Sequence, residues 1–348
     1  MTEPSHTRLY GSGLQNLSPG YFALVMATGI ISTALAVTGF APVSSALLAV
    51  ALVAYVVLVI LYVMRLLHYR AEFLADTADA SRAFGFFTFV AASDVLALRL
   101  ALGGQASLFA ALAILAALAW VACSYALVPR VVMRPSKRAV REEVTGAWLI
   151  WVVGTQSLAL AAARASVLWP GGRGFLELAA VSLWAAGTCL YLLLMAILLA
   201  RLVLVPTERP DLSPTYWINM GATAISVFAG ASLLGLHDLR GGPALVDLVG
   251  PTVAGVSVML WAFGTWWFPL LVVLTIWRLG GRSGMRSYEP SLWSVVFPLG
   301  MYSVASMALG RVLDTAALTT VGTYESWVAL AAWILTLGLL FQSWVHRE

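Results

Sequence analysis

Four ionisable residues, Asp94, Arg99, Arg164 and Arg311, lie inside or at the edge of long apolar stretches. Charged side chains are costly in a hydrocarbon environment, so such positions are candidates for function. The three arginines fall near the same end of their stretches, where together they would concentrate anions and repel cations. Each could instead snorkel to the membrane interface or pair with an acidic residue. The pattern indicates either an outer anion-attracting mouth or interfacial anchors.

Asp94 lies about two-thirds of the way along its apolar stretch. An acidic group at that depth can serve as the ion-pair partner of an arginine or as a proton relay. The residue types favour the structural ion pair and leave the proton site as the alternative.

Metal and cofactor chemistry inside a bilayer would normally require histidines within the apolar stretches. The four histidines fall in predicted tails or loops: His6, His68, His237 and His346. The chain contains neither HExxH nor GxSxG, and Gly280–Gly284 reads as a basic turn rather than a phosphate loop. We therefore expect no enzyme activity, no metal site and no cofactor.

The elements that hold these residues must be membrane spans. Of the 348 residues, 61% are hydrophobic and 10% are charged, and the mean hydropathy is +0.90. Soluble proteins carry about 25% charged residues. The composition predicts an all-α, multi-pass membrane protein in a plasma or inner membrane. It excludes a soluble enzyme, a nucleic-acid-binding domain and a secreted disulfide scaffold.

A spanning helix needs about 20 apolar residues, and ten stretches meet that length. They are 18–39, 43–67, 83–102, 105–127, 146–167, 175–201, 213–235, 250–278, 291–313 and 324–345. The predicted organisation is a short tail (1–17), one ten-helix transmembrane domain (18–345) and a short C-terminus (346–348). Fifteen of the 20 basic residues lie on the side shared by both termini. The positive-inside rule therefore places both termini in the cytoplasm.

The odd-numbered spans resemble one another. Each begins near a Ser or Thr that could cap the helix: Ser18, Ser81, Thr145, Ser213 and Ser291. Each also carries small and hydroxylated residues at mid-membrane depth, whereas the even-numbered spans are richer in Leu and Val. This repeat predicts five helical hairpins in a quasi-five-fold arrangement, with the odd helices lining a central pore. The candidate pore-lining residues are Thr28, Gly29, Ser93, Asp94, Gly154, Thr155, Gly221, Thr223 and Gly300. Close helix packing is the alternative use of small residues.

The ninth span contains Trp293-Ser-Val-Val-Phe-Pro-Leu-Gly300. Pro298 removes one helix hydrogen bond and bends the helix, which could direct Phe297 toward the axis. An aromatic plug would close an apolar pore sterically and by dewetting. Ordinary packing is the alternative for a phenylalanine before a proline.

Three segments carry a family resemblance: SPGYFALVMATGIIS (18–32), TYWINMGATAIS (215–226) and WSVVFPLGMYSVA (293–305). They resemble the tellurite-resistance/dicarboxylate transporter family, whose relatives include malate permeases and slow anion channels. The resemblance spans essentially the whole chain. It implies a homotrimer in which each protomer holds its own pore, lined by the five odd helices. It also implies that Phe297, with Pro298 beside it, occludes that pore.

The predicted function is permeation of small anions, such as chloride, nitrate or a C4-dicarboxylate like malate. The alternative is a proton-coupled C4-dicarboxylate or tellurite/oxyanion carrier of the same fold, with Asp94 as a proton site. Both functions place the protein among small anions and lipid, with no nucleic-acid partner.

Overall fold

The computed structural model describes residues 13–133, 143–236, 245–280 and 288–345. Every regular element in these ranges is helical. Ten helices are long and apolar enough to cross a membrane, which confirms the predicted fold class and number of spans. Most of the predicted N-terminal tail and the whole predicted C-terminus (346–348) lie outside the described residues.

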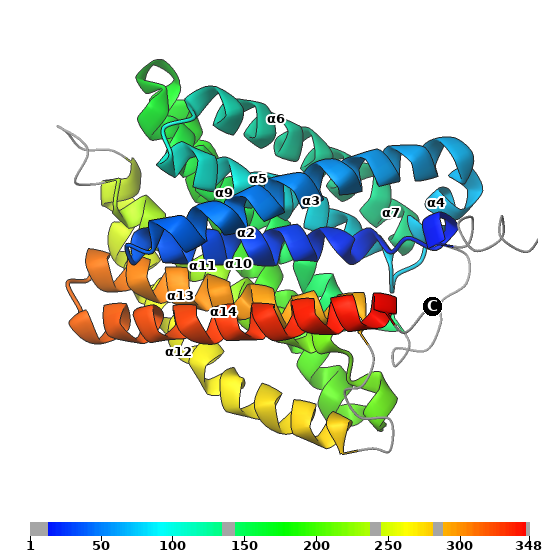
Figure 1. Ribbon diagram of the computed structural model, residues 1–348. Helices are drawn as coiled ribbons and strands as arrows, with labels where there is room; N and C mark the ends of the chain where they lie inside the picture. The colour runs from blue at the N-terminus through cyan, green and yellow to red at the C-terminus, as the bar shows by residue number, and fades with distance from the viewer. Residues whose placement is uncertain (1–12, 134–142, 237–244, 281–287, 346–348) are drawn as a thin grey trace, which may run out of the picture.

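The ten spans divide into two sets, shown in Figure 1. The inner helices are α2 (Ala23–Val37), α5 (Phe87–Leu102), α9 (Ile150–Leu168), α11 (Ile218–Leu234) and α13 (Trp293–Val312). The outer helices are α3 (Ala41–His68), α6 (Ala106–Ala122), α10 (Arg173–Leu204), α12 (Leu245–Leu279) and α14 (Ala316–Val345).

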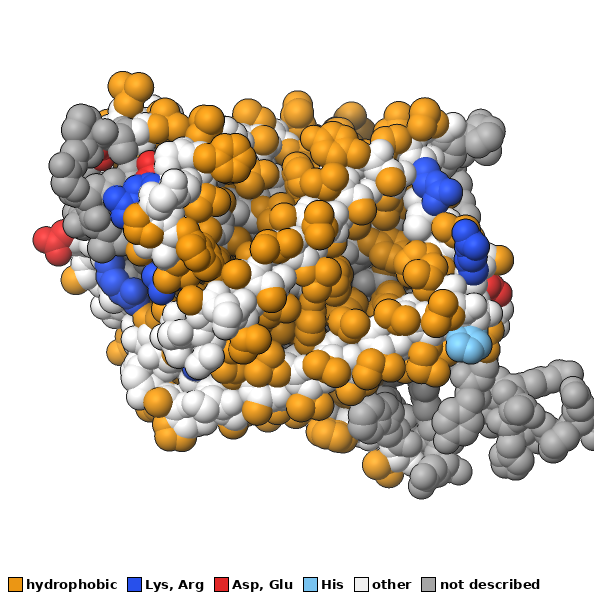
Figure 2. Space-filling model, turned by 90° about the horizontal axis from the view of Figure 1, so that it is seen from above, with side chains coloured by type: hydrophobic (Ala, Val, Ile, Leu, Met, Phe, Trp, Pro, Cys, Tyr) orange, Lys and Arg blue, Asp and Glu red, His pale blue; other side chains and the backbone are white. Residues whose placement is uncertain are grey.

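Burial separates the two sets as the sequence predicted. In the apolar stretch of each inner helix, 72–83% of the residues are buried within the protein, against 11–39% in the outer helices. Figure 2 shows hydrophobic side chains across the middle of one face and charged side chains at its two ends. That distribution is the one a bilayer requires of a spanning protein.

The inner helices form a closed ring. Each packs against the next in chain order, and α13 packs against α2. Each outer helix packs against the inner helix of its own hairpin, and α14 also contacts α2. The inner helices therefore surround a common axis, whereas the quasi-five-fold arrangement stays a prediction.

Every inner helix begins with a short 3₁₀ turn. These turns are η1 (Pro19–Phe22), η2 (Ala83–Phe86), η4 (Gly146–Leu149), η7 (Pro214–Trp217) and η9 (Pro290–Leu292). Each turn contacts the next, and η9 contacts η1, so all five inner helices start at one end and run in the same direction. We call this the N-terminal end of the ring and the opposite one its C-terminal end. A Cβ on Gly146 would overlap the backbone of Thr215, so only glycine permits that contact between turns.

Three of the five predicted caps are present. The hydroxyls of Ser18, Thr145 and Ser213 accept hydrogen bonds from backbone N–H groups at the starts of their 3₁₀ turns. The prediction was wrong for the other two positions. Ser81 donates both its N–H and its hydroxyl to Asp79, and Ser291 lies inside η9.

Several helix boundaries also differ from the prediction, among them the start of the tenth span and the end of the fourth. Helix α14 begins at Ala316 rather than at 324, because hydroxyls in its first turns are satisfied within the helix; that of Thr323, for example, donates to the carbonyl of Thr319. The fourth span continues past 127 as far as Val132, through a π turn at Cys123–Leu127.

Candidate functional site: a cavity next to a buried phenylalanine

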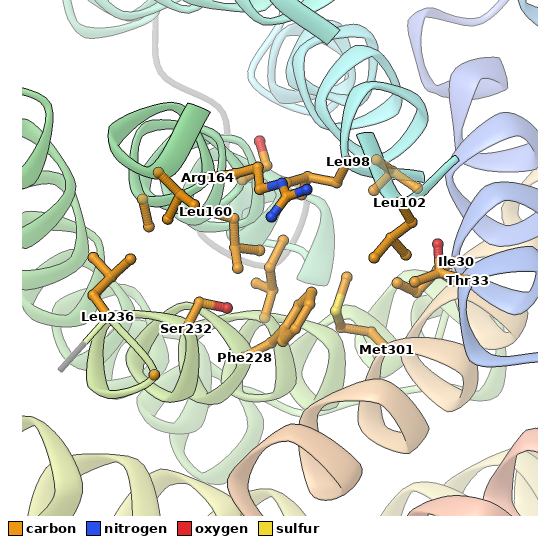
Figure 3. Close-up of a pocket in the computed structure, with 16 residues that line it drawn as sticks. Ile30, Thr33, Leu98, Leu102, Leu160, Arg164, Phe228, Ser232, Leu236 and Met301 are labelled. Carbon is orange, nitrogen blue, oxygen red and sulfur yellow. The ribbon is translucent and has the colours of Figure 1, made fainter. Parts of the chain in front are cut away.

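A cavity of about 250 Å³ lies on the axis, toward the C-terminal end of the ring. All five inner helices contribute to its wall. Its polar side chains are Thr33, Ser157, Arg164 and Ser232, and most of the remaining lining is aliphatic or aromatic. Figure 3 shows the guanidinium of Arg164 directed into the space between Leu98, Leu102 and Phe228.

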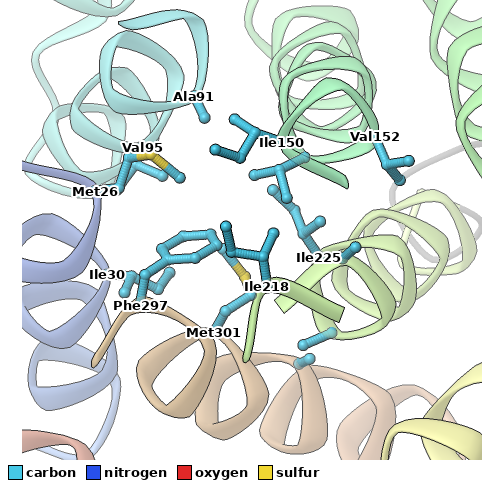
Figure 4. Close-up of a cluster of buried hydrophobic side chains, with 14 of the residues drawn as sticks. Met26, Ile30, Ala91, Val95, Ile150, Val152, Ile218, Ile225, Phe297 and Met301 are labelled. Carbon is cyan, nitrogen blue, oxygen red and sulfur yellow. The ribbon is translucent and has the colours of Figure 1, made fainter. Parts of the chain in front are cut away.

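Phe297 lies within the inner ring on the N-terminal side of this cavity. The residue is 2% exposed, and its ring lies among aliphatic side chains from all five inner helices (Figure 4). The labelled side chains of this cluster, apart from the more distant Val152, are Met26, Ile30, Ala91, Val95, Ile150, Ile218, Ile225 and Met301. Four of them, Ile30, Val95, Ile225 and Met301, also line the cavity. The cavity therefore ends directly on the cluster that surrounds Phe297.

The position of Phe297 depends on its two neighbours, Pro298 and Gly221. Pro298 lies inside α13 and lacks the N–H that would complete the helical hydrogen bonds. A Cβ on Gly221 of α11 would lie 3.0 Å from Pro298 Cγ and 3.3 Å from Phe297 Cε1. Glycine at this position thus lets the Phe297–Pro298 pair pack directly against α11.

The three arginines of the predicted mouth occupy different environments. Arg164 is half-buried and lines the cavity. Arg99 is buried, and its guanidinium donates to the hydroxyls of Ser32 at 3.0 Å and Ser44 at 2.8 Å. Arg311 is exposed at the end of α13. Arg164 alone of the three reaches the cavity wall.

Asp94 is fully buried in α5 and faces α9. Its Oδ2 accepts a hydrogen bond from the Ser157 hydroxyl at 2.7 Å. The other oxygen, Oδ1, accepts none within the described part of the chain. Nor does any Lys or Arg of that part form an ion pair with Asp94. The partner of Asp94 is therefore the Ser157 hydroxyl and not the arginine that the sequence had favoured.

A comparison with known protein families shows to which family the chain belongs. The sequence model described as voltage-dependent anion channel (SLAC1) matches residues 16–341, nearly the whole chain. The chain belongs to this voltage-dependent anion channel family. The match confirms the predicted membership in the superfamily of slow anion channels, tellurite-resistance proteins and malate permeases.

Curated relatives agree with a membrane transporter. An uncharacterized membrane protein of Mycobacterium tuberculosis (strain H37Rv) is 44% identical over 147 residues, covering 42% of this chain and 73% of that protein. An uncharacterized transporter of Methanocaldococcus jannaschii is 24% identical over 342 residues, covering 94% of each chain. A second uncharacterized transporter of that archaeon is 27% identical over 154 residues, covering 44% of this chain and 42% of that protein.

The hydroxyls predicted to line the pore of this anion channel family member instead face the outer helices. Thr28 Oγ1 accepts from Trp333 Nε1 at 2.9 Å, and Thr155 Oγ1 accepts from Trp120 Nε1 at 2.9 Å. Three further bonds have the same arrangement and join Tyr55 to Ser93, Trp184 to the Ser226 carbonyl, and Trp261 to Ser306. In each case an outer helix bonds the inner helix of the following hairpin. Thr223 likewise packs against Gly264 of α12.

The glycines among the predicted pore-lining residues mark helix crossings. A Cβ on Gly29 would lie 2.9 Å from Val95 of α5, and one on Gly300 would lie 2.8 Å from Ile30 of α2. A Cβ on Gly154 would lie 3.2 Å from the ring of Phe87. These positions allow the inner helices of the channel family fold to approach closely.

The cavity hydroxyls Thr33, Ser157 and Ser232 were not among the predicted pore-lining residues. A usable signal was present, because Ser157 lies seven residues before Arg164, and Ser232 lies seven after Ile225. That spacing places both members of each pair on one face of a helix. Within the described ranges, no three His, Cys, Asp or Glu side chains lie close enough to hold a metal ion.

Proposed function

We propose that this member of the anion channel family conducts small anions along the axis of the inner ring, with Phe297 as the gate. Suitable anions are chloride, nitrate and C4-dicarboxylates such as malate. We further propose a homotrimer in a plasma or inner membrane, with one pore in each protomer and both termini cytoplasmic. The observation that carries the proposal is the position of Phe297, where the cavity meets an apolar cluster drawn from all five inner helices.

The chemistry of the cavity and that of the cluster around Phe297 both support anion passage. Arg164 places one positive group in a cavity whose lining, among the described residues, contains no acidic side chain, so anions are favoured there over cations. On the N-terminal side of the cavity, the aliphatic cluster around Phe297 offers no hydrogen bonds to a hydrated ion. A constriction of that kind blocks ions by excluding water.

A proton-coupled C4-dicarboxylate or tellurite/oxyanion carrier is the second candidate. It is favoured by the buried Asp94, which has no cationic partner in the described residues. A coupled carrier requires a group that gains and loses a proton next to the substrate path. A carrier's flux would saturate and collapse without a pH gradient, whereas a channel's flux follows the anion gradient alone.

The gate is tested by anion flux from liposomes that contain wild-type protein, Phe297→Ala or Phe228→Ala. We expect Phe297→Ala to raise chloride flux at least about tenfold, because removing the ring opens the constriction. Phe228 lines the wider cavity, so its removal should leave the closed state intact. A Phe297→Ala protein that is expressed normally and conducts no more than wild type would refute the gate.

A further inference from the structure

Ser157 is shared between the cavity wall and the buried carboxylate behind it. Ser157 is one of the residues that line the cavity, and it is fully buried. Its Oγ lies 2.7 Å from Asp94 Oδ2 and 2.9 Å from the carbonyl oxygen of Gly154. A hydroxyl has one proton to donate and two lone pairs that accept. The state of Asp94 therefore decides where the Ser157 proton can go.

When Asp94 is ionised, it can only accept. Its strongest available donor is the Ser157 hydroxyl, because hydrogen bonds to a charged oxygen are about twice as strong as neutral ones. The Ser157 proton then points away from the cavity, and the oxygen offers only lone pairs to the axis. An anion beside it meets both these lone pairs and the full negative charge behind them.

When Asp94 is protonated, the direction of the bond reverses. The carboxyl O–H donates to Ser157 Oγ, and the Ser157 proton is released from Asp94. It can then turn to the Gly154 carbonyl or to an anion in the cavity. A charged acceptor wins that competition against a neutral carbonyl. The same protonation removes the negative charge next to the cavity.

The surroundings of Asp94 leave few groups that could take over this role. Helices α2 and α6 and the turn η2 contribute no titratable residue, and η1 contributes only Tyr21. From α3, the Tyr55 hydroxyl bonds Ser93, the residue before Asp94; the other titratable groups of α3 lie toward its far end. From α9, Arg164 is directed into the cavity. On α5 itself, Arg99 is engaged with two serines.

We propose that Ser157 is an anion-coordinating hydroxyl in the pore and that a proton on Asp94 switches it on. This inference rests on the proposed anion pathway and assigns that pathway its second polar contact. Arg164 and Ser157 lie on one face of α9, about two helical turns or 10 Å apart. An anion moving down the cavity meets the guanidinium first and the hydroxyl next, above the Phe297 cluster. Because proton and anion favour each other at this site, each raises the affinity for the other by the same factor.

The test uses the full-length protein in liposomes with Phe297→Ala as the background, so that the gate is removed from the measurement. Chloride flux is recorded at equal pH on both sides, from alkaline to acidic, at a fixed membrane potential. We expect flux to rise about tenfold on acidification, the effect of gaining one hydrogen bond to a charged group. Asp94→Asn should hold flux at the acidic level throughout, since its amide N–H₂ donates to Ser157 permanently. Ser157→Ala should hold it at the alkaline level.

The matched control is Glu325→Gln, which neutralises another partly buried carboxyl that is not among the residues lining the cavity. It should keep the pH dependence of the background protein. The switch is overturned if Asp94→Asn keeps the pH profile of the background protein, or if Ser157→Ala has the same flux as the background protein at every pH. Either result leaves the anion pathway in place. Absence of chloride flux in the background protein at every pH would instead count against the proposed function.

A second measurement does not depend on flux. Infrared difference spectra between acidic and alkaline samples report the protonated carboxyl of Asp94, identified as the band lost in Asp94→Asn. We expect that band to shift in Ser157→Ala, because its hydrogen-bond acceptor is gone, and to shift in the wild type when chloride replaces a large impermeant anion. A band that ignores both changes rules out the linkage between Asp94 and the cavity.

Discussion

The two sides of each inner helix differ sharply. The side that faces the axis carries aliphatic residues such as Met26, Ile30 and Val95 around Phe297. The side that faces the outer helices carries hydroxyls bonded to tyrosine or tryptophan, as in Thr155 with Trp120. A hydroxyl inside a bilayer needs a partner, and the outer helices supply it. These hydroxyls thus hold the wall together, while the part of the axis around Phe297 is apolar.

The test with the largest expected effect removes three of the hydrogen bonds between inner and outer helices at once. Replacing Trp120, Trp261 and Trp333 with Phe keeps the aromatic volume and deletes the indole donors to Thr155, Ser306 and Thr28. At about 0.6 kcal/mol for each interhelical bond, the loss of stability should approach ~2 kcal/mol. It is measured as the shift of the thermal unfolding midpoint in detergent.

The control for that triple variant replaces two exposed tryptophans, Trp266 and Trp327, with Phe. Their unfolding midpoint should stay close to that of the wild type. An equal loss in the control and in the triple variant would show that the indole bonds do not hold the ring together.

A second test compares Arg164, which lines the cavity, with Arg99, which lies away from it. Arg164→Gln removes the positive charge of the cavity and should lower chloride flux about tenfold at low ionic strength, a barrier change of about 1.4 kcal/mol. The defect should shrink at high salt, which screens the charge. Arg99→Gln should instead reduce thermal stability and leave flux per folded protein unchanged, because Arg99 bonds Ser32 and Ser44 away from the cavity. Equal flux defects in both variants would contradict the contrast.

The smallest expected effect is that of a single hydrogen bond between an inner and an outer helix. A double-mutant cycle of Trp120→Phe and Thr155→Val isolates the 2.9 Å bond between them. The coupling energy should be about 0.6 kcal/mol in favour of the pair. Strictly additive losses would mean that this bond contributes nothing beyond packing.

The sequence alone was sufficient for the layout of the fold. Ten apolar stretches, the alternation of small-residue and Leu-rich spans, and the contrast between the two sets gave the number of helices and the inner ring. Phe297 was singled out through the kink that Pro298 implies, and its role as a gate stays a prediction. These features depend on composition and local backbone chemistry, which one chain displays directly.

The direction in which individual side chains point was harder to predict from the sequence. Helical periodicity groups Thr28 or Ser93 with residues on the same face, but it does not reveal whether that face meets the axis or an outer helix, since both surroundings are apolar. The decisive information lies in the partners Trp333 and Tyr55, which belong to other hairpins. The separation of Arg99 from Arg164 was hidden for the same reason, because Ser32 and Ser44 come from other helices.

The common direction of the five inner helices has an electrical consequence. Peptide dipoles that point the same way around one axis add rather than cancel, with the positive pole at the ring of 3₁₀ turns. Arg99 and Arg311, in the last turns of α5 and α13, offset the negative pole at the other end. An anion therefore crosses a standing field that is not the same in the two directions. For the anion pore proposed above, this field predicts rectification, with more current in one direction than in the other between identical solutions.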